Sequence, residues 1–215
     1  MIRHIIWDWN GTLFDDAPLS WMVTREMLIE RGKDPLTFEA YVSIMGHPYE
    51  EAYRKAGFVY TDEESYADLA RIWAEGYERG WKDRSLRAGA QELLRDLKER
   101  GISQSILTAA REKSARMQME YLGVSDCFCL IQGVENDLAE GKEQMALAHR
   151  DAIGVPAHEI LLVGDTAHDA HVADAIGCEC VLLRGGHMDE ARLRRTGKII
   201  LWDMEALRRF IGERI

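Results

Sequence analysis

The chain has 215 residues, of which 47% are hydrophobic and 30% are charged, an ordinary composition for a globular protein. Its formal net charge of −10 argues against nucleic acid and anionic membranes as partners, because both would repel it. The N-terminus has no signal-peptide pattern, and no apolar run approaches the roughly 20 residues that span a bilayer. We therefore expect no membrane contact and a cytoplasmic location.

Short apolar runs, most of them followed by a polar or glycine-containing turn and a helical pattern, predict a series of buried strands. In chain order they cover residues 5–7, 103–107, 128–131, 160–163, 181–183 and 199–201. Leucines at helical spacing predict a helix over residues 89–100, which Gly101 ends. Because strands alternate with helices, the predicted fold class is α/β, with a doubly wound, Rossmann-like parallel sheet covered on both faces.

The segment between the first two strands is much longer than a crossover helix needs. Residues 17–86 read as mostly helical, with Pro18 suited to a helix start and an apolar stripe that ends near Gly32. We therefore predict a helical cap domain at residues 17–86, inserted after the first strand. Residues 1–16 and 87–215 would form the α/β core.

Four cysteines form two Cys-x-Cys pairs, Cys127/Cys129 and Cys178/Cys180. A four-thiolate zinc site is one interpretation. However, the Cys-x-x-Cys spacing of zinc knuckles is absent, and each pair reads as part of a strand with no turn to bring its thiols together. We therefore favour buried free cysteines.

Polar side chains follow several of the predicted strands. Asp8 follows the first strand and Thr108 the second, while Asp165 and Asp169 follow the fourth. Lys142 begins a helix between the third and fourth strands. Because ligands of a doubly wound sheet bind at the carboxyl ends of its strands, we expect these side chains to meet in one crevice.

This combination of side chains suits phosphoryl transfer. The three aspartates supply the hard oxygen ligands that Mg²⁺ prefers, and the metal would offset repulsion between Asp8 and an anionic phosphate. Asp8 could then form an aspartyl-phosphate. Thr108 and Lys142 would hold the phosphoryl oxygens. Gly11 would let the backbone bend after Asp8, so that free N–H groups there could bind phosphate.

The stretches WDWNGTLFDD, ILTAA, GKEQM and LLVGDTAHD occur in that order. In these motifs the chain resembles the haloacid dehalogenase-like superfamily, whose members carry Asp-x-Asp-Gly-Thr after a hydrophobic strand, then a Ser/Thr, a Lys and an acidic Gly-Asp-x-x-x-Asp type motif. The resemblance covers nearly the whole chain, and the helical insertion is similar to the C1-type cap of phosphoglycolate-phosphatase-like members. It implies a Mg²⁺-dependent phosphatase whose partner is a small phosphorylated metabolite.

The resemblance also implies a role for individual residues. Asp8 would be the nucleophile. The metal ligands would be Asp8, the backbone carbonyl of Asn10, Asp165 and Asp169. The phosphate-binding residues would be Gly11, Thr12, Thr108, Ala109 and Lys142. The sheet order of the family would place the strands that hold the two cysteine pairs at opposite edges.

Position 10 departs from the usual pattern of the family, in which an aspartate protonates the leaving group and then activates water. Asn10 cannot transfer protons in this way. General acid–base catalysis typically contributes about 10²- to 10⁴-fold, so we expect a slow phosphatase. A replacement acid–base group could come from His47, His168 or His187, although each also reads as a structural or surface residue.

Other functions remain open at this point. Asn10 could leave a phosphate-binding or non-hydrolytic protein, either a phosphotransfer protein or a nearly inactive one. A two-component receiver domain also carries a phosphorylatable aspartate, but the helical insertion and the fourth motif speak against it. Dehalogenase chemistry fits poorly because Asp165 and Asp169 are retained. No motif indicates the particular substrate or the oligomeric state.

Overall fold

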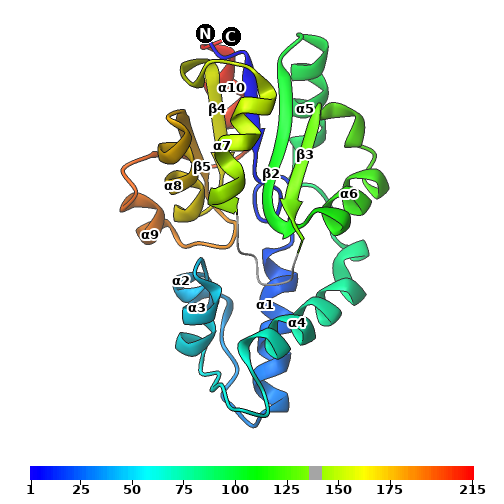
Figure 1. Cartoon of the computed structure of the whole chain (residues 1–215), viewed down its shortest axis with the longest axis vertical. Helices are drawn as coiled ribbons and strands as arrows, with labels where there is room; N and C mark the ends of the chain where they lie inside the picture. Colours follow the sequence, from blue (N-terminus) through cyan, green and yellow to red (C-terminus); the bar gives the residue numbers. More distant parts are fainter. Residues whose placement is uncertain (136–141) are drawn as a thin grey trace.

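The computed structural model describes residues 1–135 and 142–215 (Figure 1). Gly141, which opens the GKEQM stretch, lies outside the described residues. Among the described residues, six parallel strands form one sheet in the order β3-β2-β1-β4-β5-β6. The strands are β1 (His4–Trp7), β2 (Ser103–Arg111), β3 (Leu130–Val134), β4 (Ile160–Gly164), β5 (Glu179–Leu183) and β6 (Ile199–Leu201). The predicted α/β class with a parallel sheet is confirmed.

Helices cover both faces of this sheet because its strands are apolar on both sides. Along β1, Ile5 and Trp7 pack into one hydrophobic cluster and Ile6 into the other, as expected for side chains that alternate across a strand. The first cluster includes side chains of α5 (Ala90–Glu99), α6 (Glu112–Tyr121) and α10 (Met204–Gly212). The second includes those of α7 (Lys142–Ile153), α8 (Ala167–Ile176) and α9 (Glu190–Arg194).

Four helices lie between β1 and α5, where the sequence predicts a helical insertion. They are α1 (Ala17–Glu30), α2 (Phe38–Ile44), α3 (Tyr49–Ala56) and α4 (Tyr66–Gly80). Figure 1 shows them gathered beyond the carboxyl ends of the strands, away from the two chain termini. The division into a core at 1–16 and 87–215 and a cap at 17–86 stays a prediction. None of the described helices combines the length and apolar character needed to cross a membrane.

The cysteine pairs differ from the expectation in two respects. β3 begins at Leu130, so Cys127 and Cys129 precede it, and Cys127 closes a short 3-10 turn with its N–H donated to Val124 O. Cys180 belongs to β5 and Cys178 directly precedes it, and β5 is not an edge strand because β6 lies outside it. All four cysteines are free, and β2, β1 and β4 separate the two pairs. Cys127, Cys178 and Cys180 are buried as predicted, whereas Cys129 is exposed, and the separation of the two pairs is incompatible with one four-thiolate site.

β2 is longer than predicted and runs through Thr108 to Arg111. Its pairing with β3 shifts register between Leu107 and Arg111. This irregularity lies at the carboxyl end of the strand, next to Asp8, because β2 pairs with β1. Thr108 and Ala109 therefore lie within the strand rather than after it.

Candidate active site

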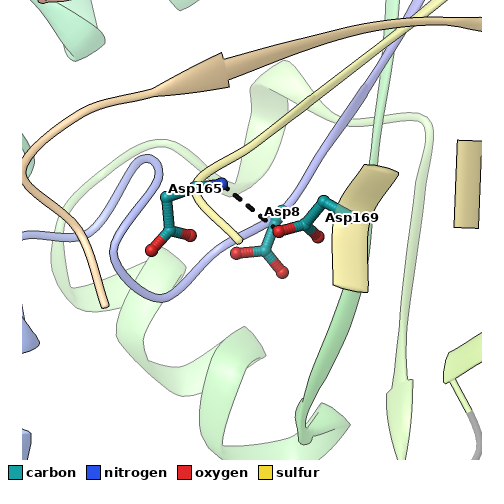
Figure 2. Close-up of side chains that lie close together, drawn as sticks. All are labelled: Asp8, Asp165 and Asp169. Atoms are coloured by element: carbon teal, nitrogen blue, oxygen red, sulfur yellow. Dashed lines mark hydrogen bonds between the residues drawn. The ribbon is translucent and has the colours of Figure 1, made fainter. Parts of the chain in front are cut away.

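Three carboxylates meet at the carboxyl end of the sheet (Figure 2). Asp8 directly follows β1, and Asp165 directly follows the adjacent strand β4. Asp169 lies in the first turn of α8. One oxygen from each carboxylate lies within 4.8 Å of the others, and all three side chains are buried. The sequence prediction that these three residues converge is correct.

The backbone before α8 fixes the carboxylate of Asp169. Its Oδ2 accepts hydrogen bonds from the N–H of Asp165 at 3.2 Å, the N–H of Thr166 at 3.0 Å and the hydroxyl of Thr166 at 2.7 Å. This is a capping box at the start of α8, in which Thr166 is the N-cap. The second oxygen of Asp169, Oδ1, takes no part in the capping box and accepts a hydrogen bond from Lys142 Nζ.

Lys142 lies between two of the carboxylates. Its Nζ donates to Asp8 Oδ1 and to Asp169 Oδ1, each at 2.6 Å, and the side chain is buried. Burial alone would lower the pKa of Lys142, but attraction to Asp169 and Asp8 raises it above its ordinary value. The ammonium group is therefore charged and held in place, as binding of phosphoryl oxygens requires.

The cluster carries more negative charge than Lys142 can balance. Burial raises the pKa of Asp8 to about 8, with Asp169 and Asp165 adding to the rise and Lys142 opposing it. Burial also raises the pKa of Asp165. At Asp169 the attraction of Lys142 outweighs burial and lowers the pKa. A divalent cation among these oxygens would offset the repulsion and favour the ionised forms, so the residues present fit a Mg²⁺ site.

The remaining predicted phosphate-binding side chains surround this cluster. The hydroxyl of Thr12 lies 2.8 Å from Asp165 Oδ1 and 3.2 Å from Asp8 Oδ2, so it bridges two carboxylates. Thr108 is buried, and its Oγ1 accepts a hydrogen bond from Ala110 N at 3.1 Å. Thr108 and Ala109 line the same cavity as the carboxylates. Their roles toward phosphate stay predictions.

Gly11 has the predicted backbone bend but not a free N–H group. Its φ of 74° lies in the left-handed region, and a Cβ there would come within 2.4 Å of Asp165 Oδ2. The N–H donates to Phe14 O at 2.9 Å and to Asp16 Oδ1 at 2.8 Å. The expectation that this N–H is available to phosphate is therefore wrong for this structure, because Asp16 already accepts from it.

Asp16 is the main site residue that the sequence reasoning missed. It occupies the N-cap position of α1, yet its side chain makes no capping hydrogen bond. Its carboxylate instead accepts from Asn10 Nδ2 at 2.6 Å, from the Tyr77 hydroxyl at 2.6 Å and from Gly11 N, and it faces His187 Nε2 at 3.3 Å. The signal in the sequence was an aspartate at the end of the WDWNGTLFDD stretch, which an N-cap role would also explain.

The charge of Asp16 is well compensated although the residue is fully buried. Burial would raise its pKa, but the charge of His187 and hydrogen bonds from His187, Tyr77 and Asn10 hold the pKa below its ordinary value. Burial opposes protonation of His187, whereas attraction to Asp16 raises its pKa to about 9. The two residues form an ion pair at the edge of the site.

The three histidines considered as replacement acid–base groups have different surroundings. His187 lines the cavity and pairs with Asp16. His168 also lines the cavity, and burial together with Lys142 lowers its pKa to about 4. His47 is exposed, and its ring stacks on that of His168 with centroids 4.4 Å apart. Both ring nitrogens of His187 already have partners, since Nε2 faces Asp16 at 3.3 Å and Nδ1 lies 3.4 Å from the Tyr41 hydroxyl, so the structure does not present His187 as a proton donor to a leaving group.

Trp9, which lies between Asp8 and Asn10 in the sequence, is part of the core. It is fully buried, stacks on Phe14 with ring centroids 5.5 Å apart and donates its indole N–H to Gln118 Oε1 at 2.8 Å. Trp9 therefore packs in the core.

A cavity of about 760 Å³ extends from the carboxylates into the helical insertion. The insertion contributes several tyrosines and a tryptophan to its wall, among them Tyr49, Tyr66, Trp73 and Tyr77. No sequence pattern predicted this aromatic wall, because helical aromatic residues of an amphipathic pattern read as core. The cavity is the place where a ligand bound at Asp8 would extend.

Comparison with known protein families and curated proteins adds an independent line of evidence. A sequence model of the family described as haloacid dehalogenase-like hydrolase matches residues 5–183. Tyrosine-protein kinase PtkA of Mycobacterium tuberculosis is 30% identical over 184 residues, which cover 85% of this chain and 62% of the kinase. Phosphoglycolate phosphatase of Pseudomonas putida is 25% identical over 191 residues, which cover 86% of this chain and 70% of that protein. The chain therefore spans less than two thirds of the kinase's length.

Solved structures share the fold. A predicted phosphatase from Clostridium acetobutylicum matches with a TM-score of 0.84 at 17% identity, with 99% of each chain covered. The structure of PtkA from Mycobacterium tuberculosis matches with a TM-score of 0.80 at 27% identity, with 98% of each chain covered.

Proposed function

The chain belongs to the haloacid dehalogenase-like hydrolase family, and from this premise we propose that it is a Mg²⁺-dependent phosphatase that acts on a small phosphorylated metabolite through an aspartyl-phosphate on Asp8. The observation that carries the proposal is the buried group of Asp8, Asp165 and Asp169 with Lys142 between two of them. The phosphoglycolate phosphatases among the relatives support hydrolysis of a phosphate ester.

Asp8, Asp165, Asp169 and the backbone carbonyl of Asn10 would hold the metal. When bound, Mg²⁺ supplies charge stabilisation for a phosphoryl group next to the carboxylates. The 4.8 Å spread of the carboxylate oxygens supports this assignment, because it is small enough for one ion to reach all three.

The residues of the chain would then perform the transfer. Asp8 attacks phosphorus with one carboxylate oxygen, and the bond from phosphorus to the ester oxygen breaks. Lys142 and Thr108 stabilise the negative charge on the phosphoryl oxygens during this step. The helical insertion at 17–86 covers the cavity as a cap and excludes bulk water and macromolecules, which favours a small substrate.

Asn10 sets the rate of both half-reactions. Its carboxamide has no acidic proton to transfer to the leaving oxygen, and it cannot take a proton from the water that hydrolyses the aspartyl-phosphate. We therefore expect a slow enzyme in which the second step accumulates phosphorylated protein.

A non-hydrolytic phosphotransfer role is the second candidate. Asn10 favours it, since a phospho-enzyme that water attacks slowly can pass its phosphoryl group to another acceptor. The kinase name of one relative agrees with this candidate. The family match and the several phosphatase relatives favour hydrolysis.

The deciding experiment is phosphate release from a panel of phosphomonoesters with Mg²⁺ and with EDTA, together with the Asp8→Asn variant. A hydrolase releases phosphate repeatedly in a Mg²⁺-dependent manner, and Asp8→Asn abolishes the release. A stoichiometric phospho-enzyme without further release would support phosphotransfer instead. Full activity of Asp8→Asn without metal would contradict both candidates.

A further inference from the structure

The wall of the cavity is chemically mixed. One part carries the carboxylate of Asp8 and the ammonium of Lys142, and another carries the aromatic rings of Tyr66 and Trp73 from the helical insertion. The volume of about 760 Å³ falls in the range of cavities that enclose a drug-sized ligand. A phosphoryl group at Asp8 fills only a small part of this space, so the remainder is open to the group that carries the phosphate.

Tyr77 contacts both Asn10 and Trp73. Its hydroxyl oxygen lies 2.9 Å from Asn10 Nδ2, and its ring stacks on Trp73 with centroids 4.9 Å apart and an interplanar angle of 23°. The side chain of Tyr77 therefore lies between Asn10 and the ring of Trp73. In the proposed reaction, Asn10 faces the leaving group. Trp73 and Tyr66 are only partly buried, so ring surface remains for a ligand. Aromatic rings prefer other flat rings as stacking partners.

Asn10 restricts the chemistry of the leaving group independently of the cavity. An alkyl phosphate expels an alkoxide, which is about as basic as hydroxide. Because the pKa of water, the conjugate acid of hydroxide, is about 15.7, departure of an alkoxide needs a proton donor. A phenolate is the conjugate base of a group with a pKa of about 10 and leaves far more readily as an anion. A site without the usual acid is therefore suited to a phenolic leaving group.

We propose that the substrate class is an aryl phosphate, the monoester of a phenolic hydroxyl, whose ring binds against Trp73 and Tyr66. This inference rests on the proposed function at Asp8. In the first step the Asp8 oxygen forms a bond to phosphorus and the bond from phosphorus to the aryl oxygen breaks. The phenolate departs with that electron pair and takes a proton from solvent.

In the second step, water attacks phosphorus and the bond between phosphorus and the Asp8 oxygen breaks. Inorganic phosphate and free Asp8 are formed, and the proton of the attacking water passes to solvent. Asn10 assists neither proton transfer, but a phenolate leaves without a general acid, so hydrolysis of the aspartyl-phosphate is the slower of the two steps. Phenol is therefore released in a burst equal to the amount of enzyme, followed by slower phosphate release.

The test uses three substrates with Mg²⁺: phenyl phosphate, phosphoglycolate as an alkyl phosphate, and acetyl phosphate, which has a good leaving group but no ring. We expect kcat/KM for phenyl phosphate to exceed that for phosphoglycolate at least 100-fold. Trp73→Ala should lower kcat/KM for phenyl phosphate at least tenfold more than for acetyl phosphate, mainly through KM. Trp73→Phe, which keeps a ring, should recover most of the loss.

Trp202 provides the matched control. It is 68% exposed, and its ring packs against the Arg184 guanidinium rather than the cavity. Trp202→Ala should leave unchanged the ratio of kcat/KM for phenyl phosphate to kcat/KM for acetyl phosphate. This control separates loss of ring recognition from a general effect of removing a tryptophan.

Each alternative result has one meaning. Turnover of acetyl phosphate with phosphoglycolate equal to or better than phenyl phosphate overturns the aryl class and leaves the phosphatase function standing. Equal losses for phenyl and acetyl phosphate in Trp73→Ala also overturn it. Neither phosphate release nor phospho-enzyme from any of the three substrates overturns the proposed function and the aryl class together.

Discussion

The side-chain nitrogen of Asn10 lies 2.6 Å from Oδ2 of Asp16. Because an ionised carboxylate only accepts hydrogen bonds, this contact fixes which end of the carboxamide faces Asp16. The same nitrogen donates to the Tyr77 hydroxyl, which in turn donates to Asp16. A neutral residue at position 10 and a charged one at position 16 therefore form a matched pair.

The first prediction concerns the exchange of this pair. Asn10→Asp alone places a partly buried carboxylate in contact with the buried carboxylate of Asp16, so it should destabilise the protein and not simply restore acid–base catalysis. We expect a loss of about 2 kcal/mol at pH 8, or roughly 4–8 °C in Tm for a chain of this size. The loss should shrink at pH 5, where the two carboxylates share a proton. Thermal unfolding at both pH values measures it.

The double variant Asn10→Asp/Asp16→Asn is the matched control. It keeps one carboxylate and one carboxamide, so it should recover most of the stability lost in the single variant. It should also turn over phosphoglycolate faster than the parent, since residue 10 again carries a carboxyl group. If the two changes are additive in Tm, the pair is not coupled.

The second prediction concerns Lys142, which neutralises part of the carboxylate cluster. Lys142→Met removes the ammonium between Asp8 and Asp169 and leaves buried like charges opposed. We expect a loss of about 3 kcal/mol in the free energy of unfolding without metal, and loss of turnover. Lys55→Met is the control, because it breaks only an exposed pair with Glu51 and should leave the free energy of unfolding nearly unchanged. Equal effects of the two variants would contradict the role of Lys142.

The third prediction concerns Gly186, whose surroundings leave no room for a side chain. A Cβ there would lie 2.1 Å from Oδ2 of Asp165, the oxygen that accepts from the His187 N–H at 2.6 Å. Gly186→Ala should displace Asp165, lower stability by about 1–3 kcal/mol and weaken Mg²⁺ binding at least tenfold, as measured by calorimetry. Gly212→Ala in α10 has no neighbour within 4 Å and should be neutral or stabilising. Unchanged Mg²⁺ affinity in Gly186→Ala would contradict the assignment of Asp165 as a metal ligand.

The fourth prediction concerns a buried network below the active site. His4 bonds Ser103 and Ser105 through its two ring nitrogens at 2.9 and 2.7 Å, and His149 bonds Ser105 at 2.9 Å and Gln132 at 2.8 Å. Burial lowers the pKa of both histidines to about 4. In the unfolded chain they titrate near 6.5, so between pH 6.5 and 4 the unfolded state binds more protons and stability falls as the pH falls.

One pKa unit corresponds to about 1.4 kcal/mol, so each histidine contributes a few kcal/mol to this acid sensitivity. His149→Gln should flatten the dependence of unfolding free energy on pH in this window by up to one proton. His158→Gln, at an exposed position, is the matched control variant. The comparison uses urea unfolding at several pH values. Parallel pH curves for His149→Gln and the parent would exclude His149 as a source of the acid sensitivity.

Much of the site followed from local sequence. Apolar runs located the strands to within a few residues, and the polar residues after them had to meet, because parallel strands of one sheet end at the same edge. Asp8, Asp165 and Asp169 were found in this way. The third strand was placed two residues too early, since Phe128 and Cys129 are apolar and read as strand although they precede β3.

What the sequence determined by itself was the sheet, the order of its helices and the carboxylates at its strand ends, because periodicity and strand boundaries act over a few residues. The tertiary structure alone decided the surroundings of Asn10. Tyr77 and His187 reach Asp16 from 61 and 171 residues away along the chain. Such contacts depend on how distant helices and loops pack, and no local pattern encodes that packing. The charge next to Asn10 and the aromatic wall beyond it are therefore properties of the folded chain.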